Sequence, residues 1–345
     1  MRVMMIGGTG FIGRHAVRQL LESNHEVAIV HRGRTPLAAE GCVAEFIGER
    51  SFLDGMRGQL AAWSPDVVVD FILGSAAQAA VTLDVFRGVA RRLVAISSGD
   101  VYQAMAVLQR LESGPIEPIP LTEDSRLRAP GPTYSPETLA KVRSTYSWVD
   151  DDYDKVRVEQ ALRSDPALPA TILRLPMVYG PGDPLHRFFP ALKRIIDGRP
   201  AILFEERYAR FVPCRGYVEN VAHAIVLAAT REEATGRTYN VADPFQFTEA
   251  EWTEKIGNAL GWQGRVVTLP REHVPKHLLL PYNFAQHLFM DSTRIRAELG
   301  YREVIALKVA IGLTIEWEQA NPPQRIDPSQ FDYSAEDEAL ERASV

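Results

Sequence analysis

The chain has 345 residues, of which 46% are hydrophobic and 24% are charged, and its formal net charge is −6 at pH 7. This composition is typical of a globular protein with a sizeable core. The acidic balance argues against nucleic-acid or membrane-surface binding, both of which favour basic patches. Two cysteines are too few for a disulfide framework or a zinc site. We therefore expect no metal and no membrane partner and, because Met1 leads directly into a strand rather than a signal peptide, a cytoplasmic location.

The first half of the chain alternates between short apolar runs and helix-type segments. Because the runs are continuously apolar, we expect strands that are buried on both faces. Strands are predicted over residues 3–6, 27–30, 44–47, 66–70 and 92–96, and helices over residues 15–23 and 75–90. Strands that alternate with helices indicate βαβ units, so the predicted fold class is α/β with a doubly wound parallel sheet.

A glycine-rich turn, Gly7-Gly8-Thr9-Gly10-Phe11-Ile12-Gly13, joins the first strand to the first helix. Glycines allow the unusual backbone angles of such a turn and let the backbone approach a pyrophosphate closely. The amide groups at the N-terminus of the next helix then face the phosphates. Because a strand precedes the turn and a helix and a second strand follow it, the turn predicts a Rossmann-type site for NAD or NADP.

The end of the second strand indicates which dinucleotide is bound. An acidic side chain there suits the ribose 2′-hydroxyl of NAD, whereas a basic one suits the 2′-phosphate of NADP. The sequence has His31 followed by Arg32 and no acid at this place, and the forked guanidinium matches phosphate oxygens. NADP is therefore the preferred cofactor, and NAD is the alternative.

The second half of the chain is less regular. Residues 103–150 are rich in proline and glycine, so we expect a long excursion that is either a binding loop or disordered. Further helices are predicted at about 152–163, 187–197, 218–230, 248–260 and 292–299, with strands at 170–174 and 238–241. We divide the chain into a dinucleotide-binding domain (1–178, with 215–245 returning to it), a smaller interleaved substrate lobe (179–214 and 246–320) and a polar tail (321–345).

Several motifs are spread over most of the chain. They are the glycine turn, Gly48-Glu49-Arg50, Ser97-Ser98-Gly99-Asp100-Val101-Tyr102, Arg174-Leu175-Pro176-Met177-Val178-Tyr179-Gly180-Pro181-Gly182 and Tyr217-Val218-Glu219-Asn220-Val221-Ala222. Together they resemble those of the extended short-chain dehydrogenases/reductases, in the NAD-dependent epimerase/dehydratase group. The resemblance implies hydride transfer on a sugar or nucleotide-sugar-like substrate, with cofactor contacts from Glu49, Arg50, Ser97 and Pro176.

In this family a serine, a tyrosine and a lysine carry out the chemistry, and the tyrosine precedes the lysine by four residues on one helix. Ser98 matches the serine by its place in the motif. Lys155 with Glu159 resembles the family's lysine and glutamate, and such a lysine also contacts the cofactor. This alignment puts Asp151, rather than a tyrosine, four residues before the lysine.

No tyrosine stands four residues before a lysine anywhere in the sequence, so the alternatives stay open. One alternative pairs Tyr153 with Arg157 and gives up the glutamate match. Residues two apart on a helix lie about 200° apart around its axis, so Tyr153 and Lys155 cannot both face one cofactor from a regular helix. If the helix begins at Asp154 or Lys155, Tyr153 lies in a turn and can point inward. We take Ser98, Tyr153 and Lys155 as the candidate catalytic residues, with an unidentified group as the other candidate proton carrier.

Four further residues are predicted to face the substrate: Asp100, Tyr102, Tyr179 and Arg215. Arg215 is included because the resemblance implies an arginine near this position that clamps a diphosphate. The prediction is an NAD(P)-dependent epimerase, dehydratase or reductase, and the resemblance allows a homodimer. The alternative is a catalytically impaired protein that keeps the dinucleotide site for sensing or for binding a partner or RNA. The missing tyrosine–lysine spacing favours this alternative, and the acidic charge argues against RNA.

Overall fold

The structure, a computed structural model, describes residues 1–35, 43–245 and 247–343. Seven parallel strands form its central sheet in the order β10-β6-β5-β4-β1-β2-β3. The strands are β1 (Arg2–Ile6), β2 (Glu26–His31), β3 (Val43–Ile47), β4 (Val67–Asp70), β5 (Arg92–Ser98), β6 (Ala170–Leu175) and β10 (Thr238–Asn240). The winding direction reverses between β1 and β4, which confirms the predicted doubly wound α/β fold.

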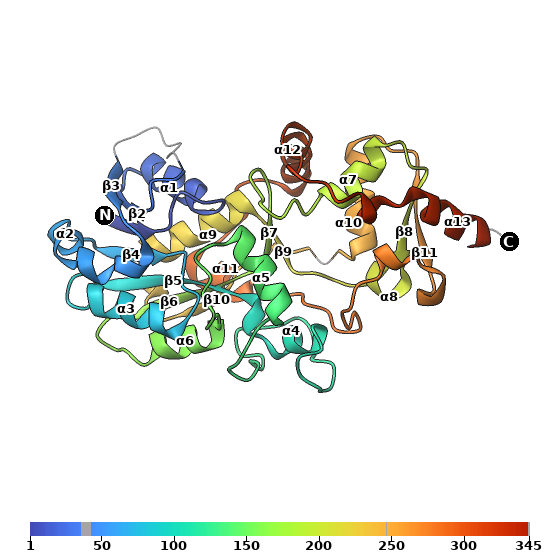
Figure 1. The fold of residues 1–345 in the computed structure, drawn as a ribbon. Coiled ribbons are helices and arrows are strands. Elements are labelled where there is room, and N and C mark those ends of the chain that lie inside the picture. Colours follow the sequence, from blue (N-terminus) through green and yellow to red (C-terminus); the bar gives the residue numbers. More distant parts are fainter. Residues whose placement is uncertain (36–42, 246, 344–345) are drawn as a thin grey trace.

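Helices cover both faces of this sheet (Figure 1). Helices α1 and α9 pack together on one face, and α3 and α6 pack together on the other, beside α2. Their bounds are Gly13–Glu22 (α1), Arg57–Ala62 (α2), Ala76–Phe86 (α3), Lys155–Arg163 (α6) and Val218–Thr230 (α9). Met5 of β1 belongs to the core beneath α1 and α9, and Met4 to the core beneath α3 and α6. Both faces of the strand are therefore buried, which explains its continuously apolar sequence.

Helix α6 begins later than the sequence pattern predicts. The pattern places its start near residue 152, whereas the helix starts at Lys155. The Asp154 carboxylate caps it by accepting a hydrogen bond from the Val156 amide at 3.0 Å. The Asp154 amide donates in turn to the Gly74 carbonyl at 2.8 Å. These bonds direct the chain away from the helix axis, so Tyr153 lies outside the helix, just after the turn at residues 151–152.

The excursion over residues 103–150 contains two helices, α4 (Gln103–Leu108) and α5 (Pro136–Thr145). Arg128 anchors the loop between them and is only 4% exposed. Its guanidinium donates to the Asp100 carbonyl at 3.0 Å and to the Asp154 carboxylate at 2.7 Å. The excursion is thus fastened to the end of β5 and the start of α6, which favours the binding-loop alternative.

A smaller lobe is built around β8 (Ala201–Glu205) and β11 (Arg265–Leu269), which pair in parallel. The parallel pair β7 (Met177–Tyr179) and β9 (Arg215–Tyr217) lies between this lobe and the central sheet (Figure 1). The other helices of this half are α7 (Phe189–Ile196), α8 (Glu206–Ala209), α10 (Glu249–Ala259), α11 (Thr293–Leu299) and α12 (Leu307–Ala320). Helix α11, predicted within the substrate lobe, packs into the core beside α9 instead. No helix formed by the described residues is long and apolar enough to cross a membrane.

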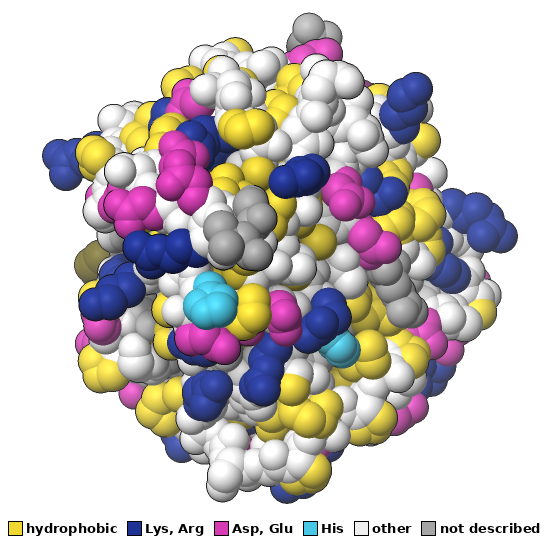
Figure 2. Space-filling view, turned by 90° about the vertical axis from the view of Figure 1, so that its right-hand side faces the viewer, with side chains coloured by type: hydrophobic (Ala, Val, Ile, Leu, Met, Phe, Trp, Pro, Cys, Tyr) yellow, Lys and Arg dark blue, Asp and Glu magenta, His cyan; other side chains and the backbone are white. Residues whose placement is uncertain are grey.

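The C-terminal tail ends in a packed helix, α13 (Tyr333–Ala343), where the sequence indicates only a polar segment. Glu336 of this helix is fully buried and accepts a hydrogen bond from Arg194 of α7 at 2.6 Å. A buried pair of this kind holds two elements together because removing one partner leaves the other charge uncompensated. Figure 2 views this end of the molecule and shows positive and negative side chains interspersed rather than a large basic patch.

Candidate active site

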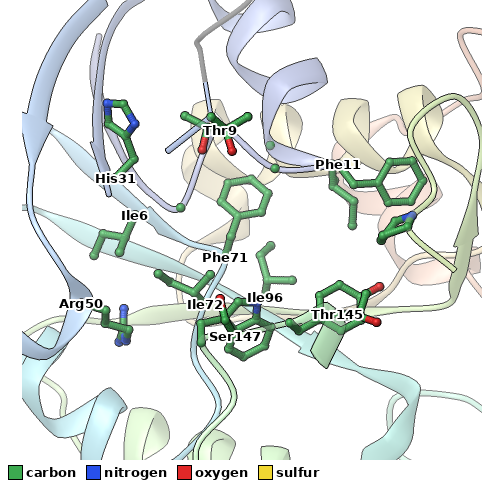
Figure 3. Close-up of a pocket in the computed structure, with 18 of the residues that line it drawn as sticks. Ile6, Thr9, Phe11, His31, Arg50, Phe71, Ile72, Ile96, Thr145 and Ser147 are labelled. Atoms are coloured by element: carbon green, nitrogen blue, oxygen red, sulfur yellow. The ribbon is translucent and has the colours of Figure 1, made fainter. Parts of the chain in front are cut away.

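A cavity of about 640 Å³ opens at the carboxyl ends of the parallel strands, where the winding direction reverses (Figure 3). The glycine turn, the segments after β2, β4 and β5, and residues from the excursion line it. His31 and Arg50 lie toward one end, and Phe11 and Thr145 toward the other. The volume is within the usual range for small-molecule sites, and the position is the one expected for a dinucleotide.

The glycine turn forms one wall of the cavity. Gly7 has a φ of +85°, a left-handed conformation that other residues disfavour. A Cβ on Gly13 would lie 2.6 Å from the Gly8 carbonyl oxygen, so α1 can approach the turn only without a side chain there. A Cβ on Gly10, by contrast, would meet nothing within 4 Å. This open space beside the amides of the first turn fits a pyrophosphate. Thr9, Phe11 and Ile12 line the same wall.

The residues after β2 bring one available cation to the cavity. Arg32 is exposed, and its guanidinium donates a hydrogen bond to the Ser147 hydroxyl at 2.8 Å. His31 is buried, with Nε2 2.8 Å from the Glu45 carboxylate. Because Arg32 contacts a hydroxyl rather than a carboxylate, its charge remains available to an anionic ligand.

Glu49 and Arg50 also line the cavity, but both are held by neighbouring charges. The Glu49 carboxylate accepts a hydrogen bond from Arg34 at 3.0 Å. The Arg50 guanidinium donates to both carboxylate oxygens of Asp70, at 2.8 and 3.0 Å. Asp70 is fully buried at the end of β4. Arg50 therefore shapes the wall, while its charge is neutralised by Asp70.

Lys155, the first residue of α6, is 3% exposed, and its side chain lines the cavity. Its ammonium group donates to the Ile96 carbonyl at 2.8 Å and to the Leu73 carbonyl. These carbonyls lie near the ends of β5 and β4, so the lysine joins two neighbouring strands beside the switch point, which lies between β4 and β1. Burial lowers the pKa of Lys155 to about 8. The charge is therefore buried but hydrogen-bonded, with the ring of Trp148 centred 5.3 Å away.

Tyr153 lines the same cavity, because the turn before α6 lets it point inward. Its hydroxyl lies 3.5 Å from the Asp100 carboxylate, and its ring centroid lies 5.9 Å from the Lys155 ammonium. Burial, reinforced by Asp100, raises the Tyr153 pKa well above its ordinary value. Asp151, which occupies the family tyrosine's position by spacing, is exposed and ion-paired with Arg143. The structure thus brings Tyr153 and Lys155 together and leaves Asp151 outside.

The other predicted cofactor and catalytic residues lie close by. Ser98 lines the cavity, and its hydroxyl accepts a hydrogen bond from the Asp100 amide at 3.2 Å. Ser97 is buried and donates to the Glu159 carboxylate at 2.7 Å. Arg157 is exposed and does not line the cavity. The alternative alignment, in which Tyr153 and Arg157 take the places of the family tyrosine and lysine, therefore puts no cation in the cavity. Pro176 lies on the cavity wall.

Tyr102 disagrees with its predicted role as a substrate contact. The residue is fully buried and does not line the cavity. Its hydroxyl donates to the Asn240 side chain at 2.5 Å and accepts a hydrogen bond from Arg174 at 3.0 Å. Both hydrogen-bonding capacities are used inside the protein, so Tyr102 ties the sheet to the excursion rather than facing a ligand.

Tyr179 and Arg215 also lie away from the cavity wall. Tyr179 stacks on Phe188 with ring centroids 5.2 Å apart, and its hydroxyl donates to Asp243 at 3.3 Å. Arg215 is ion-paired with both oxygens of Glu249, at 2.7 and 2.8 Å. The prediction that these residues contact substrate is therefore corrected: Tyr179 is a core residue, and the Arg215 charge is already neutralised.

Much of the remaining wall carries no motif in the sequence. It comes from the loop after β4, from α3, from the end of α5 with the residues that follow it, and from the segment after the glycine–proline turn. These residues are Phe71, Ile72, Gln78, Thr145, Tyr146, Ser147, Trp148, Pro184 and Arg187. The glycine–proline turn after β7 was the only sequence signal near them, because residues 145–148 belong to an aperiodic segment.

Asp243 gives a prediction for the dependence of stability on pH. Burial raises its pKa from 3.8 to about 7, and it accepts a hydrogen bond from Tyr179. The folded state therefore binds more protons than the unfolded state between about pH 4 and pH 7, so stability falls as pH rises through this window. We expect Asp243→Asn to remove this part of the pH dependence and to stabilise the protein above neutral pH, by up to about 4 kcal/mol. Urea unfolding at several pH values measures this, and an unchanged pH slope in the variant would contradict the assignment.

The fold and the cavity define a class of protein. A glycine turn at a helix N-terminus, with a serine, a tyrosine and a lysine beside it at the carboxyl edge of a parallel sheet, is the arrangement of a dinucleotide-dependent oxidoreductase of the short-chain dehydrogenase type. Within residues 1–35, 43–245 and 247–343, no group of histidine, cysteine and acidic side chains is arranged to hold a metal ion. The model of the NAD dependent epimerase/dehydratase family matches residues 3–119 and 153–242, and the chain belongs to this family.

The chain is also similar to individual members of known function and structure. It is 30% identical over 286 residues to the 2′-dehydrokanamycin reductase of Streptomyces kanamyceticus, a match covering 81% of this chain and 72% of that protein. A UDP-glucose 4-epimerase from Thermotoga maritima, solved with UDP-glucose, aligns with a TM-score of 0.65 at 20% identity, covering 93% of this chain and 99% of that one. The dTDP-glucose 4,6-dehydratase from Bacillus anthracis, solved with NAD, has a TM-score of 0.65 at 16% identity and coverages of 94% and 98%. These two structures establish likeness of fold.

Proposed function

We propose that the protein is an NADPH-dependent reductase that converts a keto group on a sugar-type substrate to a hydroxyl group. The observation that carries this proposal is the placement of Tyr153 beside Lys155 on the cavity wall. Burial and the Asp100 carboxylate keep the pKa of Tyr153 raised, so the phenol stays protonated. A protonated phenol is a proton donor, and proton donation to oxygen is what carbonyl reduction needs.

The cavity residues fit a nicotinamide dinucleotide. The glycine turn would hold the pyrophosphate, Arg32 the 2′-phosphate, and Lys155 with Pro176 the nicotinamide half. When bound in its reduced form, such a dinucleotide supplies the hydride that reduction of a carbonyl carbon requires. Ile96 and Ser97, at the end of β5, are buried residues of the cavity wall and limit the access of water to this place.

Tyr153 and Ser98 act on the substrate oxygen. As the carbonyl carbon gains a hydride, its oxygen becomes negative and takes the phenolic proton of Tyr153, which yields a hydroxyl group. Ser98 donates a hydrogen bond to the same oxygen from the end of β5. The ammonium group of Lys155 stabilises the phenolate that remains, because opposite charges attract strongly in a buried site.

The substrate that we propose carries no nucleoside diphosphate. Away from the glycine turn, a second diphosphate needs cations to bind it, yet Arg215 is bound by Glu249 and Arg187 by Asp183, each at 2.7 Å. The relative from Streptomyces kanamyceticus is a 2′-dehydrokanamycin reductase, and 2′-dehydrokanamycin is not a nucleotide sugar. Both observations favour a keto-sugar of the aminoglycoside type over a nucleotide sugar.

A substrate panel tests this proposal. The purified protein is incubated with NADPH and with 2′-dehydrokanamycin, simple keto-hexoses or keto nucleotide sugars, and loss of reduced-nicotinamide absorbance is followed. We expect turnover with the nucleotide-free keto-sugars at kcat/KM at least about tenfold above that with the nucleotide sugars, the ratio that 1.4 kcal/mol of differential binding produces. A preference for the nucleotide sugars would contradict the substrate class, and NADPH binding without turnover on any of them would contradict the reductase assignment.

Arg32 gives a prediction for cofactor choice. We expect Arg32→Ala to weaken NADPH binding about 10- to 100-fold and to leave NADH binding within about twofold, because only NADPH carries the phosphate that the guanidinium would bind. Calorimetric titration of both cofactors measures the change. Arg34→Ala is the matched control, since Arg34 is exposed and pairs with Glu49. Equal losses for the two cofactors in Arg32→Ala would show that Arg32 does not read the phosphate.

A further inference from the structure

Three side chains from separate segments meet next to the cavity. The Asp100 carboxylate, in the turn after β5, accepts a hydrogen bond from the Tyr134 hydroxyl at 2.6 Å and lies 3.5 Å from the Tyr153 hydroxyl at the same oxygen. The rings of Tyr134 and Tyr153 stack, with centroids 5.7 Å apart and an interplanar angle of 19°. Tyr134 belongs to residues 120–152, which the family model leaves unmatched. Tyr134 therefore brings a second tyrosine to the proton donor from a segment that lies outside the match to the family model.

Tyr153 needs such support because no helix holds it. The first backbone hydrogen bond of α6 runs from the Val158 amide to the carbonyl of the N-cap residue Asp154, so Tyr153 lies outside the helix and the direction of its side chain depends on what touches it. Tyr134 stacks on its ring, Trp148 contacts it with centroids 6.4 Å apart, and Asp100 faces its hydroxyl. Two aromatic neighbours and one carboxylate thus replace the helical spacing that fixes the tyrosine in the family pattern.

Arg128 fastens these three segments to one another. Its guanidinium donates to the Asp100 carbonyl at 3.0 Å, to the Thr133 hydroxyl next to Tyr134, and to the Asp154 carboxylate next to Tyr153 at 2.7 Å. The guanidinium is buried, so these hydrogen bonds are strong and its position is fixed by them. A single side chain therefore links the three segments that carry the carboxylate and both tyrosines.

We propose that Tyr134 is a positioning residue for the proton donor Tyr153, acting through the ring stack and through the shared hydrogen bond to Asp100, with Arg128 as the anchor of the assembly. The proposal deepens the reductase function proposed above and rests on it for its kinetic test. The charged and titratable groups around Tyr153 are Asp100, Arg128, Lys155, Tyr134 and Tyr146. Among them Asp100 is the carboxylate that disfavours the phenolate, and Tyr134 is the group that holds this carboxylate in place.

Kinetics of two Tyr134 variants test the positioning role. Tyr134→Phe keeps the stacked ring but loses the hydroxyl, whereas Tyr134→Leu loses both. We expect kcat to fall several-fold in Tyr134→Phe and about 100-fold in Tyr134→Leu, with KM for NADPH unchanged, because misplacing a reacting group by about 1 Å costs about that much. Wild-type kcat in both variants would overturn the proposal. So would a fall in activity that is explained by a lowered Tm and that changes KM as much as kcat.

A second measurement keeps the proposal testable if the substrate panel yields no turnover. The protein is labelled with ¹³C at the tyrosine Cζ, the ring carbon that carries the hydroxyl, and the Tyr153 resonance is assigned by its absence in Tyr153→Phe. NMR then follows the ionisation of Tyr153 over the alkaline pH range in which the protein stays folded. We expect Asp100→Asn to make Tyr153 ionise at lower pH, because a carboxylate opposes the phenolate charge. We expect Tyr134→Leu to change the Tyr153 resonance while a distant tyrosine, Tyr282, keeps its own. No change in Tyr153 in either variant would overturn the coupling whether or not the protein reduces a keto-sugar.

Discussion

Replacing Lys155 by methionine is expected to lower kcat about 10³-fold or more and to weaken NADPH binding as well. The ammonium group is a buried positive charge on the cavity wall, and it contacts the ends of β4 and β5 through the carbonyls of Leu73 and Ile96. Methionine fills a similar volume without charge. It therefore removes both the donor that we propose for the nicotinamide half of the cofactor and the charge that we propose stabilises a phenolate at Tyr153.

Methionine also withdraws the Lys155 donor from the carbonyls of Leu73 and Ile96, and a buried carbonyl that loses its donor costs about 1–3 kcal/mol. The free energy of unfolding must therefore be measured with the kinetics. Lys141→Met is the matched control, because Lys141 is exposed on α5 and pairs with Glu137 one turn away. Full activity in folded Lys155→Met would contradict the site.

The same residue predicts the pH dependence of turnover. Burial lowers the Lys155 pKa to about 8, so the ammonium loses its proton as pH rises through that value. Turnover in the direction of reduction should fall along this limb, because the neutral amine no longer stabilises the phenolate of Tyr153. A kcat profile that stays flat to well above pH 8 would show that the Lys155 charge does not contribute.

Tyr153→Phe is expected to lower kcat about 10²- to 10⁴-fold, the contribution of a well-placed general acid, with little change in NADPH binding. The phenyl ring keeps the stacking on Tyr134 and the contact with Trp148, so only the proton donor is lost. Asp151→Asn is the decisive comparison. Asp151 stands four residues before Lys155, where the family pattern has its tyrosine, but it is exposed and paired with Arg143.

We expect Asp151→Asn to keep kcat within about twofold, since an exposed ion pair contributes only about 0–1 kcal/mol. Rates of a single turnover with saturating NADPH separate the chemical step from product release. If Asp151→Asn loses activity and Tyr153→Phe keeps it, the catalytic group is Asp151, as the four-residue spacing to Lys155 indicates, and our assignment of Tyr153 is wrong.

The fold and the cofactor wall follow from the sequence because they depend on local patterns. Continuous apolar runs predict the strands of the parallel sheet, and the glycine turn predicts the open space beside Gly10. The predicted strand at 66–70 and the observed β4 (Val67–Asp70) differ by one residue. Such features need only neighbours in the chain, so a single sequence contains them.

The substrate side of the site depends on contacts between distant residues, which no local pattern contains. Tyr102 and Arg215 match family motifs, yet one is bonded to Asn240 and the other to Glu249, far along the chain. The path of the chain before α6 depends on the hydrogen bond from Asp154 to Gly74, which lies about 80 residues earlier. The sequence alone therefore does not determine whether Tyr153 points into the cavity. Tyr134 lies in an aperiodic, proline-rich segment, and no motif marks it.

Isotope transfer tests the central claim most directly. The protein is given NADPH that carries deuterium at the transferable position of the nicotinamide ring, together with 2′-dehydrokanamycin, and the product is analysed by mass spectrometry and NMR. Hydride transfer in the cavity predicts one deuterium on the former carbonyl carbon of the product, with the label nearly absent in Tyr153→Phe over the same time. A protein that binds the labelled NADPH but transfers no deuterium to this or any keto-sugar of the panel would instead use the dinucleotide site for sensing or partner binding.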